Sequence, residues 1–120
     1  MTLRVVLAQV NLLVGDIEGN AALVMQAASR ARDEQQADLI VFPELTLTGY
    51  PPEDLLLRQE LFARVETAIE EIRNAISGIT LVFGYPRSTE RGLFNAAGVF
   101  RDGNLLGEYF KWLLPNYSVF

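Results

Sequence analysis

The sequence predicts an α/β fold built on one mixed sheet, with its elements in the order β-α-β-α-β-β-β. Short apolar and β-branched segments alternate with two longer segments in which apolar residues recur every three or four positions. Near the end of the chain, a turn signal separates two further apolar segments. Alternating strands and helices are typical of parallel pairing with right-handed crossovers, and a final hairpin adds antiparallel strands.

The first half is predicted to form a βαβ unit. Residues 3–9 and 37–42 are mostly apolar, as expected of strands covered on both faces. The helix between them is expected to run to about Glu34, with Asn20 as its N-cap. Pro43 ends the second strand, because proline cannot donate to a sheet. A loop rich in Gly and Pro follows.

The second helix has the clearest periodicity in the chain and is predicted over residues 58–77. Glu60 and Arg64 have the i, i+4 spacing of a helical ion pair. Gly78 stands where a glycine commonly ends a helix. Asp54, ahead of this helix, is expected to cap a short helical turn.

Three strands are predicted after the second helix. Residues 80–85 form the first of them, and residues 93–100 and 105–111 form the other two. Asp102-Gly103-Asn104 lies between the last two and is a strong hairpin signal. The sheet is therefore expected to be parallel at its start and antiparallel at its end.

Composition excludes several classes of function. The 120 residues fit one domain, and 15 acidic against 10 basic residues give a net charge of −5, which disfavours nucleic acid as a partner. Without His or Cys, the chain has no disulfide, thiolate metal site, thiol nucleophile or Ser-His-Asp triad. The amino terminus lacks the features of a signal peptide or membrane span, so we expect a cytoplasmic protein that binds no membrane.

Two charged residues stand at positions suited to chemistry. Glu44 directly follows the second strand, and ligands bind outside such strand ends in open α/β sheets. It is a candidate general acid or base, or else a glutamate that ties down the loop. Lys111 lies between two aromatic residues at the end of the last strand. It could pair with Glu44, stabilise an oxyanion, or extend its stem along apolar surface with its head in water.

Two tyrosines and one acidic pair are weaker candidates. Tyr50 and Tyr117 lie in proline-containing loops, where each could line a pocket or anchor its loop through a backbone hydrogen bond. Glu53-Asp54 favours a helix N-terminus rather than a metal site, because a metal site needs more carboxylates nearby. The glycines match no phosphate-binding motif, so no cofactor is predicted for this chain.

The carboxyl end predicts that the chain is part of something longer. Residues 113–120 combine a Pro-Asn turn with an apolar, aromatic run and no polar tail. Exposed apolar segments promote association, so natural domains seldom end in this way. We therefore expect a fragment of a longer polypeptide. We also expect a homo-oligomer.

Three segments together resemble the nitrilase, or carbon–nitrogen hydrolase, superfamily. They are LRVVLAQVN from Leu3, FPELTLTGYPPEDLL from Phe42 and FKWLLPNYSVF from Phe110, and the resemblance covers essentially all of residues 1–120. PPEDLL combined with LPNY is similar to the glutamine-hydrolysing domain of glutamine-dependent NAD⁺ synthetases. The resemblance implies the amino-terminal portion of an αββα sandwich with a Glu-Lys-Cys triad. Because roughly half of that sandwich would be missing, it also implies a truncated fold with an open, apolar sheet face.

The resemblance also implies roles for individual residues. Glu44 matches the general base and Lys111 the lysine that stabilises the tetrahedral intermediate, while Tyr50 and Tyr117 match residues that shape the glutamine pocket. The implied reaction releases ammonia from glutamine. In the parent enzyme, a synthetase domain in the same polypeptide uses that ammonia, with ATP and Mg²⁺, to amidate deamido-NAD.

The chain departs from the family pattern in one decisive respect, which is that it contains no Cys. It should therefore be inactive by itself, since two members of a triad provide no covalent route. The synthetase domain is absent as well. Two other interpretations stay open: an amidase of another nitrilase branch, and a non-catalytic binding module that has lost its nucleophile.

Overall fold

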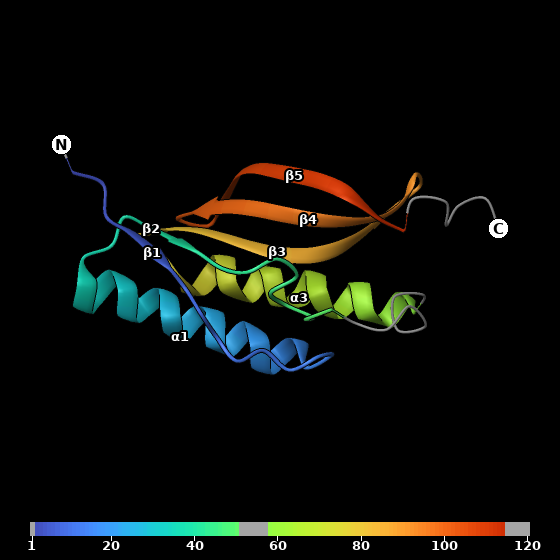
Figure 1. Cartoon of the computed structure of the whole chain (residues 1–120), viewed down its shortest axis with the longest axis horizontal. Helices are drawn as coiled ribbons and strands as arrows, with labels where there is room; N and C mark the ends of the chain where they lie inside the picture. Colours follow the sequence, from blue (N-terminus) through green and yellow to red (C-terminus); the bar gives the residue numbers. More distant parts are fainter. Residues whose placement is uncertain (1, 51–57, 115–120) are drawn as a thin grey trace.

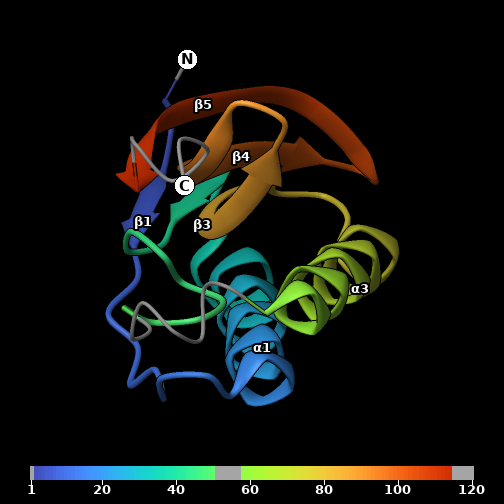
Figure 2. The ribbon, with the colours of Figure 1, turned by 90° about the vertical axis from the view of Figure 1, so that its right-hand side faces the viewer.

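Two helices cover one face of a five-stranded mixed sheet in the computed structural model, which describes residues 2–50 and 58–114 (Figures 1 and 2). The strands lie in the order β1-β2-β3-β4-β5, so each strand pairs with its neighbour in sequence. The first two pairings are parallel and the last two antiparallel. The predicted element order and the change from parallel to antiparallel pairing are both confirmed.

The βαβ unit consists of β1 (Val5–Leu7), α1 (Ile17–Gln35) and β2 (Leu39–Val41). Both strands are shorter than the apolar segments that predict them. Val6 pairs with Ile40, and Ile40 in turn pairs with Leu81 on β3. This register carries the chain that follows β2 along the side of β3.

The start of α1 differs from the prediction. Asp16, not Asn20, is the N-cap, and its carboxylate accepts a hydrogen bond from the amide of Gly19 at 3.1 Å. Asn20 lies one turn into the helix and is buried, with its side chain directed at two loops. Because Asp and Asn cap helices about equally well, the sequence alone does not distinguish the two positions.

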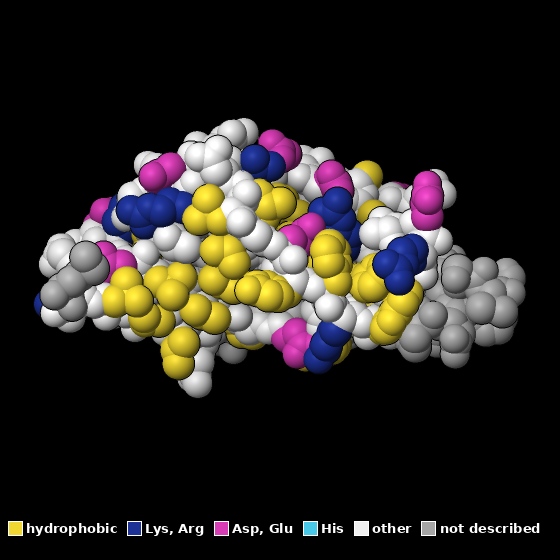
Figure 3. Space-filling view, turned by 90° about the horizontal axis from the view of Figure 1, so that it is seen from above, with side chains coloured by type: hydrophobic (Ala, Val, Ile, Leu, Met, Phe, Trp, Pro, Cys, Tyr) yellow, Lys and Arg dark blue, Asp and Glu magenta, His cyan; other side chains and the backbone are white. Residues whose placement is uncertain are grey.

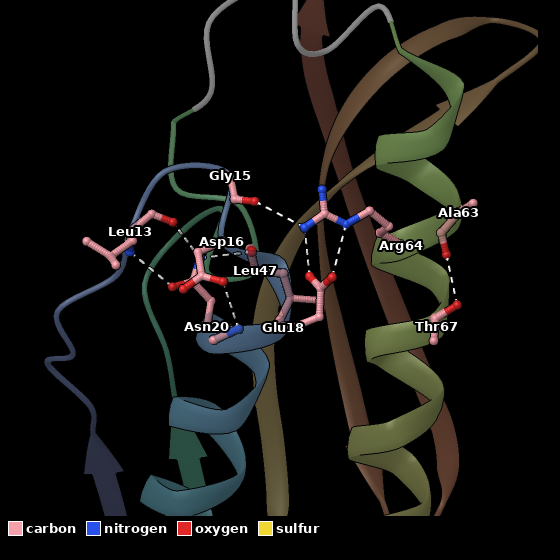
Figure 4. A network of polar contacts seen from close by, with 10 residues as sticks. Leu13, Gly15, Asp16, Glu18, Asn20, Leu47, Ala63, Arg64 and Thr67 are labelled. Atoms are coloured by element: carbon pink, nitrogen blue, oxygen red, sulfur yellow. Dashed lines mark hydrogen bonds and ion pairs between the residues drawn. The ribbon is translucent and has the colours of Figure 1, made fainter.

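The second helix, α3 (Gln59–Ala75), packs beside α1. The expected pair of Glu60 with Arg64 does not form. The guanidinium of Arg64 instead reaches across to Glu18 on α1, with an N–O distance of 2.7 Å, and also contacts the carbonyl of Gly15 (Figure 4). A partner on the neighbouring helix replaces the partner one turn away.

The antiparallel part of the sheet comprises β3 (Thr80–Thr89), β4 (Gly92–Arg101) and β5 (Asn104–Leu114). These strands are longer than predicted, and β3 continues through Pro86. Asp102 and Gly103 have φ angles of 51° and 84°, as a two-residue type I′ hairpin turn requires. The predicted hairpin is therefore confirmed.

The hydrophobic core lies between the helices and one face of the sheet. Apolar side chains of both helices meet those of β2, β3 and β4, including Val24, Ile72, Ile40, Phe83 and Phe100. Neither helix is both long and apolar enough to cross a bilayer, as far as the chain is described.

Within residues 2–50 and 58–114, no helix lies over the opposite face of the sheet. Alternation along the strands directs Val5, Leu7 and Tyr109 to this side, and all three are exposed. Figure 3 shows hydrophobic side chains gathered on this surface. In the part of the chain that the structure describes, helices therefore cover one side of the sheet only, as expected for a partial sandwich.

Candidate active site

Glu44 lies near the start of a tightly turned loop, residues 43–49, that follows β2. The loop runs beside β3, and the amide of Leu47 donates to the carbonyl of Gly84 at 3.1 Å. The turn closes when the amide of Gly49 donates to the carbonyl of Leu45 at 2.8 Å. Leu45 has a φ of 51°, a conformation uncommon for a leucine. The backbone is thus bent sharply at the residue after Glu44.

The buried polar residues of the described chain all serve this loop or contact Glu44. They are Asn20, Thr46, Thr48 and Asn95. The Thr46 hydroxyl donates to the carbonyl of Pro43, and that of Thr48 donates to the carbonyl of Gly49. No buried side-chain polar atom lacks a partner within the described residues. Since buried polar groups must be paired, these bonds restrict the loop to one conformation.

Asn20 joins the loop to the helical layer (Figure 4). Its amide nitrogen donates to the carbonyls of Leu13 at 2.8 Å and Leu47 at 3.0 Å, and its oxygen accepts from the amide of Leu13 at 3.0 Å. Every hydrogen-bonding valence of the amide except one acceptor position is therefore used. Sequence reasoning gave Asn20 the role of a helix cap and missed this one.

Glu44, Lys111 and Asn95 meet although they come from three separate elements. The Lys111 ammonium lies 3.0 Å from Oε1 of Glu44, and the side-chain amide of Asn95 donates to the same oxygen. Asn95 on β4 and Lys111 on β5 are direct cross-strand partners, which accounts for their convergence. The sequence identified Glu44 and Lys111 as candidates, but it gave no sign of Asn95.

The ion pair is partly open to solvent, since the side chains of Glu44 and Lys111 are 42% and 69% exposed. Pairs this exposed contribute little to stability, because water screens the charges. Asn95, by contrast, is buried at 7% exposure. Within the described residues, the carboxylate is therefore accessible on one side and hydrogen-bonded on the other.

The other candidate site residues are distributed as follows. Tyr50 lies just beyond the Glu44 loop, and its side chain is 66% exposed. Tyr117 and Asp54 lie outside the described residues. No cluster of three or more potential metal ligands occurs in the ranges 2–50 and 58–114. A pocket of ≈ 420 Å³ at the β3–β4 turn, lined by Thr89, Glu90, Arg91, Phe94 and Phe110, includes neither Glu44 nor Lys111.

A second polar group lies further along β3 and β5. The Tyr85 hydroxyl donates to Oε2 of Glu108, and Arg87 pairs with the same carboxylate at 3.0 Å. Burial raises the pKa of the Tyr85 phenol well above its ordinary value, and the neighbouring Glu108 carboxylate raises this pKa further. Tyr85 therefore stays protonated and attaches β5 to β3.

A carboxylate paired with a lysine at a strand end, on a mixed sheet with helices on one face, agrees with the family expectation. The carbon–nitrogen hydrolase family model matches residues 4–118. Because this match covers nearly the whole chain, the protein belongs to the carbon–nitrogen hydrolase family.

The chain is also similar to individual proteins over nearly all of its length. The chain is 44% identical over 119 residues to the glutamine-dependent NAD(+) synthetase of Xanthomonas campestris, covering 99% of this chain and 22% of that protein. It is also 44% identical over 122 residues to the Thermotoga maritima enzyme of that name, covering 98% of this chain and 20% of the relative. The chain thus spans about a fifth of the length of these curated relatives.

Solved structures show the same fold. The glutamine-dependent NAD⁺ synthetase of Acinetobacter baumannii, in complex with ADP, has a TM-score of 0.85 at 43% identity, over 98% of this chain and 22% of that one. An amidase from Nesterenkonia sp., with a glutamate and a cysteine replaced and acrylamide bound, has a TM-score of 0.76 at 27% identity. That match covers 91% of this chain and 42% of the amidase.

Proposed function

We propose that residues 1–120 form the amino-terminal portion of the glutamine-hydrolysing domain of a glutamine-dependent NAD⁺ synthetase. The observation that carries the proposal is the 3.0 Å pair of Glu44 with Lys111, on a fold shared with proteins of that name. The pair unites the two residues for which the sequence predicts catalytic roles. The nucleophilic cysteine is then supplied by a longer natural polypeptide, since these 120 residues contain none.

The proposed reaction uses Glu44 as a proton carrier. The carboxylate takes the proton of the cysteine thiol, and the resulting thiolate attacks the amide carbon of glutamine. Lys111 stabilises the negative charge that develops on the amide oxygen. Ammonia leaves with the proton that Glu44 returns, and a water activated by Glu44 then hydrolyses the thioester. Because the Glu44 carboxylate and the Lys111 ammonium lie within hydrogen-bonding distance of each other, both can act on one reacting centre.

Tyr50 is proposed to line the glutamine pocket. Its exposed ring stands at the end of the Glu44 loop, where it can contact a substrate that reaches the carboxylate. A tyrosine offers both an apolar face and a hydroxyl to an amide substrate. The same role for Tyr117 stays a prediction from the sequence.

The described residues do not fit ATP or Mg²⁺. They include no cluster of metal-ligating carboxylates, and the sequence has no phosphate-binding glycine loop. We therefore assign the nucleotide and the metal to a synthetase domain elsewhere in the natural polypeptide. Glutamine is the one small-molecule partner proposed for these residues, and cytoplasmic location and homo-oligomer formation stay predictions.

An amidase of another branch is the second candidate, because the Nesterenkonia amidase shares the fold at 27% identity. Its substrate would be a small amide rather than glutamine. A non-catalytic module is the third, and the missing cysteine is the observation that favours it. Activity of the natural polypeptide towards glutamine and towards acrylamide distinguishes the three.

The test is ammonia release by the natural polypeptide that contains this chain. We expect release from glutamine, with a loss of a hundredfold or more in Lys111→Ala, about the effect of removing one oxyanion donor. Glu44→Gln should lose at least as much. The matched control is Glu34→Gln, since Glu34 pairs with Arg30 on the exposed side of α1.

Two results would contradict the proposal. Faster turnover of acrylamide than of glutamine would favour the second candidate. Retention of activity in Lys111→Ala within about twofold would reduce Lys111 to a structural residue.

A further inference from the structure

Asn95 is placed in the middle of β4 with a buried side chain. Asparagine is disfavoured within strands, and a buried amide is costly unless its hydrogen bonds are made. The amide nitrogen of Asn95 donates to Oε1 of Glu44, in a loop far away in sequence. The register of β4 and β5 places Lys111 directly opposite. The strand thus carries a polar residue at a position from which its side chain reaches the glutamate.

Within the described residues, both side chains that contact the Glu44 carboxylate do so at the same oxygen. Lys111 lies 3.0 Å from Oε1, and Asn95 donates to Oε1 as well. Oε2 accepts no hydrogen bond from any described residue. A carboxylate has two oxygens that can accept independently, so anchoring one leaves the other available.

Asn95 and Lys111 make different contributions to the carboxylate. Lys111 is a long, flexible, exposed side chain that brings charge but fixes little direction. Asn95 is short, buried and neutral, so it can fix the carboxylate plane and take no proton from it. Orientation of the carboxylate therefore depends on the asparagine.

We propose that Asn95 is a positioning residue that anchors Oε1 of Glu44 and so assigns Oε2 as the proton-accepting oxygen. The inference deepens the proposed function and rests on it. The thiol S–H bond breaks as an O–H bond forms at Oε2, and the same proton later passes to the departing ammonia. Asn95 touches neither the thiol nor the amide.

The kinetic test uses Asn95→Leu in the natural polypeptide, which keeps the branched shape of the side chain and removes the donor. We expect kcat for glutamine to fall about ten- to a hundredfold, the scale of one hydrogen bond to a charged group. KM should stay within about threefold, because the substrate does not contact Asn95. The matched control is Phe100→Leu, which alters the helix-facing side of the same strand, where Phe100 stacks on Phe83.

A spectroscopic test does not depend on activity, and it follows the Asn95 amide in variants of Glu44 and Lys111. With ¹⁵N-labelled asparagine, the side-chain amide of Asn95 is assigned by its absence in Asn95→Asp. We expect its signal to move strongly in Glu44→Ala, which removes the acceptor. In Lys111→Met, which keeps the acceptor, it should move much less.

The outcomes separate this inference from the proposed function. A kcat for Asn95→Leu within twofold of wild type, or a fall that only matches Phe100→Leu, overturns the positioning role. An Asn95 amide signal indifferent to Glu44→Ala overturns the anchor itself. If the wild-type polypeptide releases no ammonia, the proposed function fails, and the amide signal then decides whether Asn95 anchors Glu44.

Discussion

Gly84 supports Glu44 by being small. A Cβ added at this position would lie 2.6 Å from the Leu45 amide nitrogen and 3.4 Å from Cα of Glu44. Both are backbone atoms, so the contact cannot be relieved by turning a side chain. Because Gly84 has no side chain, the backbone at Glu44 and Leu45 can bend sharply against β3.

Gly84→Ala should destabilise the chain by about 1–3 kcal/mol, the usual cost of overpacking. Gly107→Ala is the matched control, because a Cβ at Gly107 meets nothing within 4 Å. Gly107→Ala should be neutral or slightly stabilising, since alanine restricts the unfolded chain. Urea unfolding of the two variants measures the difference. Equal midpoints would mean that the loop can retreat from β3.

Tyr85 should make stability fall in strong alkali. The folded state raises the pKa of this phenol above its ordinary value of 10.0, so the proton is bound more tightly in the folded state. The stabilisation is complete below pH 10 and is lost as pH rises beyond that, because the unfolded chain ionises first. Glu108, Arg87 and Glu66 are the charged groups that act on Tyr85.

The measurement is the urea midpoint between pH 9 and pH 11, compared with Tyr85→Phe. The wild type should lose more stability over this interval than the variant, which has no phenol to ionise at this position. Parallel pH curves for the two proteins would show that Tyr85 ionises equally easily in both states.

Single residues also show where the sequence is informative and where it is not. The sequence predicts Glu44 and Lys111 as site residues because they stand at the ends of predicted strands, inside motifs with a family resemblance. Asn95 was missed because its role depends on the pairing of β4 with β5 and on the path of a distant loop. Arg64 was assigned to Glu60 because only the contact along its own helix could be expected.

Among the elements, the first turn of α1 acts as a support for the Glu44 loop. Asn20 reaches both the segment before the helix and the Glu44 loop, so one amide joins three parts of the chain. Beside it, the guanidinium of Arg64 on α3 donates hydrogen bonds to the carboxylate of Glu18 on α1 and to the carbonyl of Gly15, just before α1 (Figure 4). The helices thus fix the loop as well as covering the core.

Asn20→Ala should lower the free energy of unfolding by about 2–3 kcal/mol, because it removes the hydrogen-bond partner of the buried Leu47 carbonyl and of the part-buried backbone groups of Leu13. Asn74→Ala is the control, since Asn74 is exposed on α3 and alanine favours a helix. Chemical unfolding gives both values. A loss in Asn20→Ala no greater than in the control would exclude a supporting role for the amide.

Elements were predicted well where a local signal is strong. The periodic second helix and the Asp102-Gly103 hairpin both occur as expected. Strand lengths were less accurate, because β3 to β5 extend beyond the apolar runs through mutual pairing. In particular, β3 continues through Pro86, although the sequence predicts that this strand ends at residue 85.

At the scale of the whole molecule, the described residues cover the sheet on one face and leave it open on the other. Exposed apolar side chains on the open face include Val5, Leu7 and Tyr109. Contiguous apolar surface promotes association or marks an interface. The sequence predicted this open face from the resemblance to a sandwich, and its composition alone would not have indicated it.

The 120-residue chain should therefore bind a hydrophobic dye and self-associate at higher concentration. Leu7→Lys should reduce both effects, because it places a charge on the open face. The control Thr67→Lys adds the same charge on α3, on the helical side, and should leave both unchanged. Dye fluorescence and light scattering follow the two effects. A monomer that binds no dye would show that this surface is not accessible.

The mixed pairing of the sheet also sets an order in which the site can assemble. Asn95 and Lys111 face each other across a tight hairpin, so they can meet as soon as that hairpin closes, within microseconds. Glu44 lies beyond a parallel crossover, and its contact must await a much larger loss of chain entropy. In a refolding chain, Asn95 and Lys111 should therefore come together first, and the Glu44 carboxylate should join them last.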